Sequence, residues 1–228
     1  MHVNLGAVRA VFLDVDGVLL DSLPQHLRFC ADMAREYGLQ DLEIPTIEDF
    51  KRMVSRGVIV SPMLHFFLAV GFPPPLAKRG VEDYEREFMQ RCRPVPFPGI
   101  QDMLKRLSDA GLALGLVTSN TRANVEPALS DAMRYFDPRC LFYFDRYPEA
   151  RDKAWCLAEG TRTLRLAPAR SIYVGDQPGD ADAARAAGLQ FLGVSYGWGL
   201  QPGEVSMYTV DSVHAVADAL LANSAPVG

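Results

Sequence analysis

The stretch AVFLDVDGVLLDS, residues 10–22, places two carboxylates at the end of an apolar run. Asp14 and Asp16 are separated by one residue, and Gly17 follows them directly. Like charges at such short range repel each other, and burying either carboxylate without a partner is costly. A bound cation is the simplest remedy. We therefore expect a buried strand whose C-terminal end carries a functional site.

Three more apolar runs have the character of buried parallel strands, because each is short and rich in Val, Leu or Ile. They are LALGLVTS at 112–119, SIYVGD at 171–176 and QFLGVSYG at 190–197. Helical patterns lie between the runs, at 99–111 and 179–188, and each ends in a glycine typical of a helix C-terminus. This alternation predicts an α/β fold with a doubly wound, Rossmann-like parallel sheet.

Residues 22–93 interrupt the alternation, because their patterns are helical and include no convincing parallel strand. The segment ends at RPVPFPG, residues 93–99, where three prolines stiffen the return of the chain. We expect an inserted α-helical cap at 22–94 and a catalytic core formed by 1–21 and 95–228. The alternative is that these helices simply flank the sheet.

Length and composition limit the class of protein. The chain has 228 residues, 49% of them hydrophobic, which suits one large domain or a domain with an insertion. Its net charge is −5, so we expect no basic face for nucleic acid. The longest apolar stretch, MLHFFLAVGF at 63–72, has ten residues and includes a histidine, which is too short to span a bilayer.

The four cysteines and the first residues indicate a cytoplasmic protein. Cys30, Cys92, Cys140 and Cys156 are scattered without a paired spacing, so we expect mostly buried, reduced thiols and no zinc site. The opening MHVNLGAVRA has no charged lead followed by a hydrophobic block, as a signal peptide would.

Polar side chains follow three of the predicted strands. They are Asp14 and Asp16 after the first run, Thr118, Ser119 and Asn120 after the second, and Asp176 and Asp180 after the third. Ligands of open α/β sheets bind outside the carboxyl ends of the strands, so we expect these groups at one edge. Lys153, at the predicted start of a helix, adds a positive charge.

These groups suit the transfer of a phosphoryl group. The carboxylates of Asp14, Asp16 and Asp176 are hard oxygen donors of the kind that Mg²⁺ prefers. A carboxylate can attack phosphorus, and a second carboxylate can protonate the leaving oxygen and later deprotonate water. The Thr118 hydroxyl and the amides after it would bind phosphoryl oxygens. In this scheme one carboxylate of the pair in 10–22 attacks phosphorus and the other transfers protons, while the cation reduces the repulsion between them.

With these motifs the chain resembles the haloacid dehalogenase superfamily of aspartate-dependent phosphatases and phosphotransferases. DVDGVLLDS resembles the first motif of that family, Asp-x-Asp-Gly-x-x-x-Asp-Ser, and LVTSN resembles the second. Lys153 resembles the third motif and VGDQPGD the fourth. Their order and spacing match over about 8–20 and 96–200, in the phosphoglycolate phosphatase and beta-phosphoglucomutase-like branch.

The resemblance implies a role for each carboxylate. Asp14 would be the nucleophile and Asp16 the general acid and base. Mg²⁺ would be held by Asp14, by the backbone carbonyl of Asp16 and by Asp176. Asp180 would support the metal through water or through Lys153.

The resemblance also implies that Thr118 and the amide of Ser119 hold the transferring phosphoryl group, with Asn120 nearby. Each of these residues has a purely structural interpretation as well. Thr118 and Ser119 are good helix N-caps, and most lysines, Lys153 included, are solvated surface groups.

Within the predicted cap, KRMVSRG at 51–57 resembles a cap loop of beta-phosphoglucomutase, in which an arginine contacts the substrate's phosphate. This implies Arg56 as a substrate-binding residue. His26 stands ten residues after Asp16, where that mutase has a hinge-coupled histidine, and is a second candidate for substrate binding. The alternative for Arg56 is an ordinary surface arginine.

The sequence thus favours an enzyme, a Mg²⁺-dependent hydrolase that cleaves a small phosphomonoester through an aspartyl-phosphate. A sugar phosphomutase and a non-catalytic binding or regulatory protein on the same fold are the alternatives. Dehalogenation is disfavoured, because a dehalogenase does not need the acid/base carboxylate of Asp16. We expect a small phosphorylated metabolite as the partner, no nucleic acid or membrane, and a monomer or homodimer.

Overall fold

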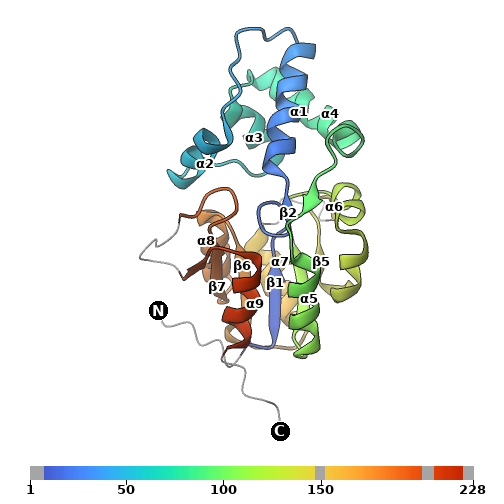
Figure 1. The fold of residues 1–228 in the computed structure, drawn as a ribbon, viewed down its shortest axis with the longest axis vertical. Coiled ribbons are helices and arrows are strands. Elements are labelled where there is room, and N and C mark those ends of the chain that lie inside the picture. Colours follow the sequence, from blue (N-terminus) through green and yellow to red (C-terminus); the bar gives the residue numbers. More distant parts are fainter. Residues whose placement is uncertain (1–7, 147–151, 202–207, 223–228) are drawn as a thin grey trace.

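The four apolar runs form the inner strands of a six-stranded parallel sheet in the computed structural model, which describes residues 8–146, 152–201 and 208–222 (Figure 1). The strand order is β5-β4-β1-β6-β7-β8, and all five pairs are parallel. The strands are β1 (Ala10–Leu13), β4 (Ala113–Val117), β5 (Leu141–Phe142), β6 (Ser171–Gly175), β7 (Gln190–Val194) and β8 (Thr209–Val210). The α/β class and the doubly wound sheet predicted from the sequence are confirmed.

The two edge strands, β5 and β8, escaped prediction. Each has only two residues, which is too short to show a hydrophobic period. The inner strands can be predicted from the sequence because they are buried and continuously apolar. β1 occupies the centre, with β4 on one side and β6 on the other.

Helices cover both faces of the sheet. Those of the core are α5 (Ile100–Asp109), α6 (Arg122–Leu129), α7 (Lys153–Thr163), α8 (Pro178–Ala186) and α9 (Val213–Leu221). Alternate residues of β1 point to opposite faces, as the pleat requires. Val11 and Leu13 pack with α5, α6 and α9, whereas Ala10 and Phe12 pack with α7 and α8. The result is a three-layer α/β/α core.

Four helices stand beyond the carboxyl ends of the strands (Figure 1). They are α1 (Leu23–Glu36), α2 (Ile47–Ser55), α3 (Met63–Val70) and α4 (Pro74–Cys92). They share an apolar cluster of their own, built around side chains such as Phe66, Phe67 and Phe88. A short antiparallel pair, β2 (Leu20–Asp21) and β3 (Val95–Pro96), connects them to the core. The exact division into a cap at 22–94 and a core at 1–21 and 95–228 stays a prediction.

The burial of the cysteines agrees with the composition. All four are buried, and none forms a disulfide bond. Within the described part of the chain, no helix combines the length and the apolar character needed to cross a membrane.

Phe12 sets how closely α7 approaches the sheet. Its side chain is completely buried, and it lies between Gly115 of β4 and Gly160 of α7. A Cβ atom at either glycine would lie 2.4 Å from the nearest atom of the Phe12 ring. The ring therefore has no free side toward which to move if either glycine gains a methyl group.

We predict that Gly160→Ala destabilises the protein despite the higher helix propensity of alanine. Overpacking lowers the free energy of unfolding by about 1–3 kcal/mol, whereas replacing glycine by alanine in a helix raises it by about 1 kcal/mol. Urea denaturation should show a lower midpoint. Gly179→Ala in α8 is the matched control, because nothing lies within 4 Å of its added Cβ. A Gly160→Ala variant at least as stable as the original would show that Phe12 does not set this spacing.

Candidate active site

The register of the three central strands brings the predicted polar groups to one edge of the sheet. Leu13 of β1 pairs with Leu116 of β4 and with Val174 of β6. The residues that follow these strands therefore emerge side by side. Asp14 is fixed directly after β1 by its backbone N–H, which donates to the Val174 carbonyl at 3.0 Å.

Lys153 joins two of the predicted carboxylates. It is the first residue of α7, and its Nζ donates to Asp14 Oδ2 at 2.6 Å and to Asp180 Oδ1 at 2.8 Å. All three groups are shielded from solvent, with side-chain exposures of 18% for Lys153, 5% for Asp14 and 3% for Asp180. A solvated surface lysine, the structural alternative for Lys153, does not fit this burial.

Asp180 is saturated with hydrogen bonds. Its second oxygen, Oδ2, accepts from the backbone N–H groups of Asp176 and Gln177, each at 3.1 Å. The latter bond belongs to the capping box at the start of α8. With both oxygens engaged, Asp180 suits a supporting position.

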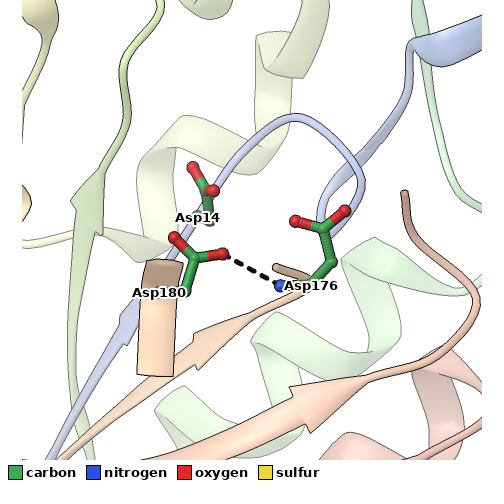
Figure 2. Close-up of side chains that lie close together, drawn as sticks. All are labelled: Asp14, Asp176 and Asp180. Carbon is green, nitrogen blue, oxygen red and sulfur yellow. Dashed lines mark hydrogen bonds between the residues drawn. The ribbon is translucent and has the colours of Figure 1, made fainter. Parts of the chain in front are cut away.

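Asp176 differs from its neighbours because one of its oxygens has no partner. Its Oδ2 accepts from the Trp198 N–H at 2.5 Å, whereas the buried Oδ1 has no hydrogen bond. Figure 2 shows Asp14, Asp176 and Asp180 converging from the end of β1, the end of β6 and the start of α8. One oxygen of each lies within 4.8 Å of the others.

Burial sets the ionisation of this cluster. It raises the pKa of Asp14 to about 7, although the Lys153 ammonium lowers it. Burial raises the pKa of Asp176 well above its usual value, and the Asp180 and Asp14 carboxylates raise it further. Burial opposes the charge on Lys153, but the two carboxylates raise the pKa of this lysine well above its usual value. The cluster thus contains one cationic group, Lys153, and three carboxyl groups.

These residues fit a divalent cation. The three carboxylates are hard oxygen donors, and the Oδ1 of Asp176 is an orphaned acceptor that a cation would satisfy. The backbone passes close to this carboxylate at two glycines: a Cβ at Gly17 would lie 2.1 Å from Asp176 Oδ2, and one at Gly197 would lie 2.5 Å from it. Neither position could carry a side chain without displacing the carboxylate.

Asp16 is not part of that cluster, and two neutral donors hold its carboxylate. Ser22 Oγ donates to Oδ1 at 2.6 Å, and Asn120 Nδ2 donates to Oδ2 at 2.9 Å. Ser22 is the N-cap residue of α1, but its side chain makes no capping bond. The hydroxyl binds Asp16 instead. That the Asp16 backbone carbonyl holds the metal stays a prediction.

One cavity brings most of the predicted residues together. Its volume is about 130 Å³, and its lining on the core side includes the residues predicted for phosphoryl transfer: Asp14, Asp16, Thr118, Ser119, Asn120 and Lys153. The Thr118 hydroxyl accepts from the Asn120 N–H at 3.0 Å. The N-cap of α6 is Thr121, so neither Thr118 nor Ser119 caps that helix. Asp176 is completely buried and does not line the cavity.

His26 lines the same cavity, but both of its ring nitrogens already have protein partners. Nδ1 donates to the Ser22 carbonyl oxygen at 2.7 Å, and Nε2 lies 3.1 Å from the Tyr84 hydroxyl and accepts from it. Burial lowers the pKa of His26, so the ring is neutral. The ring also packs against four aromatic side chains, and contact between His26 and a substrate stays a prediction.

Arg56 does not lie with the other predicted residues around the cavity. It is the exposed C-cap residue of α2 and lines neither of the two cavities at this edge. Lys51, five residues earlier, donates to the Tyr196 carbonyl at 3.2 Å and so links α2 to the core. Contact between Arg56 and a substrate stays a prediction.

Sequence reasoning missed the partners of the carboxylates. Ser22 belongs to the first motif but has no role assigned by the resemblance, and Trp198 lies outside the four motifs. Trp198 lines the cavity, packs in the apolar cluster of the cap and binds Asp176 through its backbone N–H. The glycines that flank Trp198 were the available signal, because such positions allow close backbone approach.

The chain is similar to known hydrolases in both sequence and fold. The family model of haloacid dehalogenase-like hydrolases matches residues 11–194. The chain is 29% identical to a phosphoglycolate phosphatase of Nitrosospira multiformis, covering 87% of each chain. It is 26% identical to an N-acetylmuramic acid 6-phosphate phosphatase of Pseudomonas aeruginosa, covering 84% of this chain and 83% of the relative. A haloacid dehalogenase-like family hydrolase from Streptococcus pneumoniae has the same fold, with a TM-score of 0.76, 23% identity and coverage of 93% and 98%.

We predict that Mg²⁺ raises the melting temperature of the protein and that Asp176→Asn abolishes the effect. A ligand at a hundred times its Kd stabilises the folded state by about 2.7 kcal/mol. Thermal denaturation with Mg²⁺ and with a chelator measures this difference. Asp182→Asn is the control, because Asp182 is an exposed carboxylate on α8 that pairs with Arg185. An equal Mg²⁺ effect in the Asp176→Asn variant would exclude this cluster as the metal site.

Proposed function

The chain belongs to the haloacid dehalogenase-like hydrolase family, and we propose that it is a Mg²⁺-dependent phosphatase that hydrolyses a small phosphomonoester. The observation that carries the proposal is the set of residues on one cavity wall. Asp14, Asp16, Thr118 and Lys153 come from three distant parts of the chain and line the same small space. The relatives described above, which are phosphatases of small phosphorylated metabolites, support the same reaction class.

In the first step, an Asp14 oxygen attacks phosphorus and the bond to the leaving oxygen breaks. Asp16 gives its proton to that oxygen, so the alcohol leaves neutral and Asp14 carries an aspartyl-phosphate. In the second step, Asp16 takes a proton from water, which attacks the phosphorus. The bond to Asp14 breaks, inorganic phosphate is released and both carboxylates return to their starting states.

The remaining residues position and stabilise charge. Lys153 orients Asp14 and favours its ionised form, which the nucleophile requires. The Thr118 hydroxyl and the Ser119 N–H would hold phosphoryl oxygens from the β4 side. Mg²⁺, held by Asp14, Asp176 and the Asp16 backbone carbonyl with Asp180 in support, would neutralise the charge that gathers on the phosphoryl oxygens.

The two alternative functions receive less support. A phosphomutase of the beta-phosphoglucomutase type was favoured by Arg56, which is exposed and lies outside the cavity lining. A non-catalytic protein on this fold would be free to lose a motif residue. Here Asp14, Asp16, Lys153 and Asp176 are all present and assembled.

Asp14→Asn should abolish phosphate release from a panel of small phosphomonoesters, because the amide is a poor nucleophile. We expect a fall in kcat of about a thousandfold or more. Phosphate release with and without Mg²⁺ measures it, and Asp131→Asn, at an exposed position of the core, is the control. Retained turnover in Asp14→Asn would refute the nucleophile. A requirement for a bisphosphate primer, with little phosphate released, would favour the mutase.

Ser22→Ala should lower kcat about tenfold, because the loss of one hydrogen bond leaves Asp16 less well oriented for proton transfer. The KM should change little, since Ser22 has no place in the cavity lining. Steady-state kinetics separates the two parameters. Ser55→Ala, whose hydroxyl bonds only within α2, is the matched control. A change confined to KM would show that Ser22 acts on substrate binding.

A further inference from the structure

The cap side of the cavity is lined mostly by apolar side chains, with His26, Ser61 and Glu85 as polar exceptions. Met63, Leu64 and Phe66 of α3 and Val81 and Tyr84 of α4 face the residues proposed for phosphoryl transfer. At about 130 Å³ the cavity is close to the ~150 Å³ of an engineered apolar cavity that binds benzene. The part of the leaving group that enters this cavity is therefore small and lies against an apolar wall.

Positive charge is scarce around this space. Among the described residues, Lys153 is the only lysine or arginine that lines the cavity or the wider cleft of about 680 Å³ beside it. Its ammonium is already shared between Asp14 and Asp180. A carboxylate on the leaving group would find no cation of its own, and desolvating it without a partner is costly.

The charged residue that the cap does contribute is negative. Glu85 follows Tyr84 on α4 and lines the cavity, with its side chain exposed to solvent. Its neighbours Asp83 and Glu87 both pair with Arg86. No described lysine or arginine forms an ion pair with Glu85, so no ion pair offsets its charge beside the cavity.

We propose that this enzyme selects phosphomonoesters whose alcohol is small, largely apolar and free of negative charge, and that Glu85 repels anionic leaving groups. The inference rests on the proposed phosphatase function and adds the substrate class. It departs from the relatives described above, because phosphoglycolate and N-acetylmuramic acid 6-phosphate are both phosphates of carboxylic acids. An ammonium on the alcohol would be tolerated, because Glu85 attracts it.

The test compares kcat/KM for isobutyl phosphate and 2-phosphoglycolate, whose leaving groups have similar size and branching but differ in charge. Phosphoethanolamine supplies the opposite charge, and p-nitrophenyl phosphate reports whether the enzyme is active at all. We expect isobutyl phosphate and phosphoethanolamine to exceed 2-phosphoglycolate by about tenfold or more, as for an unpaired charge brought into an apolar site.

Variants at Glu85 separate charge from shape. Glu85→Gln should raise the ratio of kcat/KM for 2-phosphoglycolate over isobutyl phosphate about fivefold, the size of one exposed charge interaction. Glu85→Lys should raise that ratio further. Glu82→Gln is the matched control, because Glu82 is an exposed glutamate on the same helix that does not line the cavity, and it should leave the ratio unchanged.

The outcomes distinguish this inference from the function beneath it. A wild-type preference for 2-phosphoglycolate, or a ratio that Glu85→Gln and Glu85→Lys do not move, would overturn the selectivity while the phosphatase stands. Absence of Mg²⁺- and Asp14-dependent turnover with every ester, p-nitrophenyl phosphate included, would overturn the phosphatase itself.

Discussion

The buried ammonium of Lys153, held between Asp14 and Asp180, is the interaction on which the site depends. Desolvation penalises all three charges, so the contact survives only if the start of α7 stays fixed against the end of β1 and the start of α8. Phe12, wedged between two glycines on the same face of the sheet, fixes the distance of α7. The packing around Phe12 therefore also fixes the position of Lys153 relative to the two carboxylates.

The same cluster is electrostatically incomplete by itself. Asp176 brings a third carboxylate whose Oδ1 is buried without a partner, and burial raises its pKa. The ionised carboxylates of this cluster repel one another. A divalent cation bound between them would stabilise their ionised forms. The protein keeps this space open by using glycines where backbone passes closest to Asp176.

Two connections tie the four-helix cap to this chemistry. The Trp198 N–H holds Asp176, while its indole packs in the apolar cluster of the cap. Ser22 holds Asp16 with its hydroxyl and His26 with its carbonyl, and His26 reaches Tyr84 on α4. A shift of the cap would therefore alter the hydrogen bonds of Asp16 and Asp176. The core supplies charge and nucleophile, while the cap supplies an apolar wall with a single uncompensated carboxylate.

The sequence by itself determined the inner strands, the interruption by helices and the polar groups at the strand ends, because hydrophobic period and motif spacing are local properties. It could not reveal the two-residue edge strands, which are too short to carry a period. Only the tertiary structure decided which oxygen of Asp176 lacks a partner, that Ser22 binds Asp16, and that Arg56 lies outside the cavity lining while Glu85 lies within it. These outcomes depend on which residues from distant segments meet, and a local pattern carries no information about that.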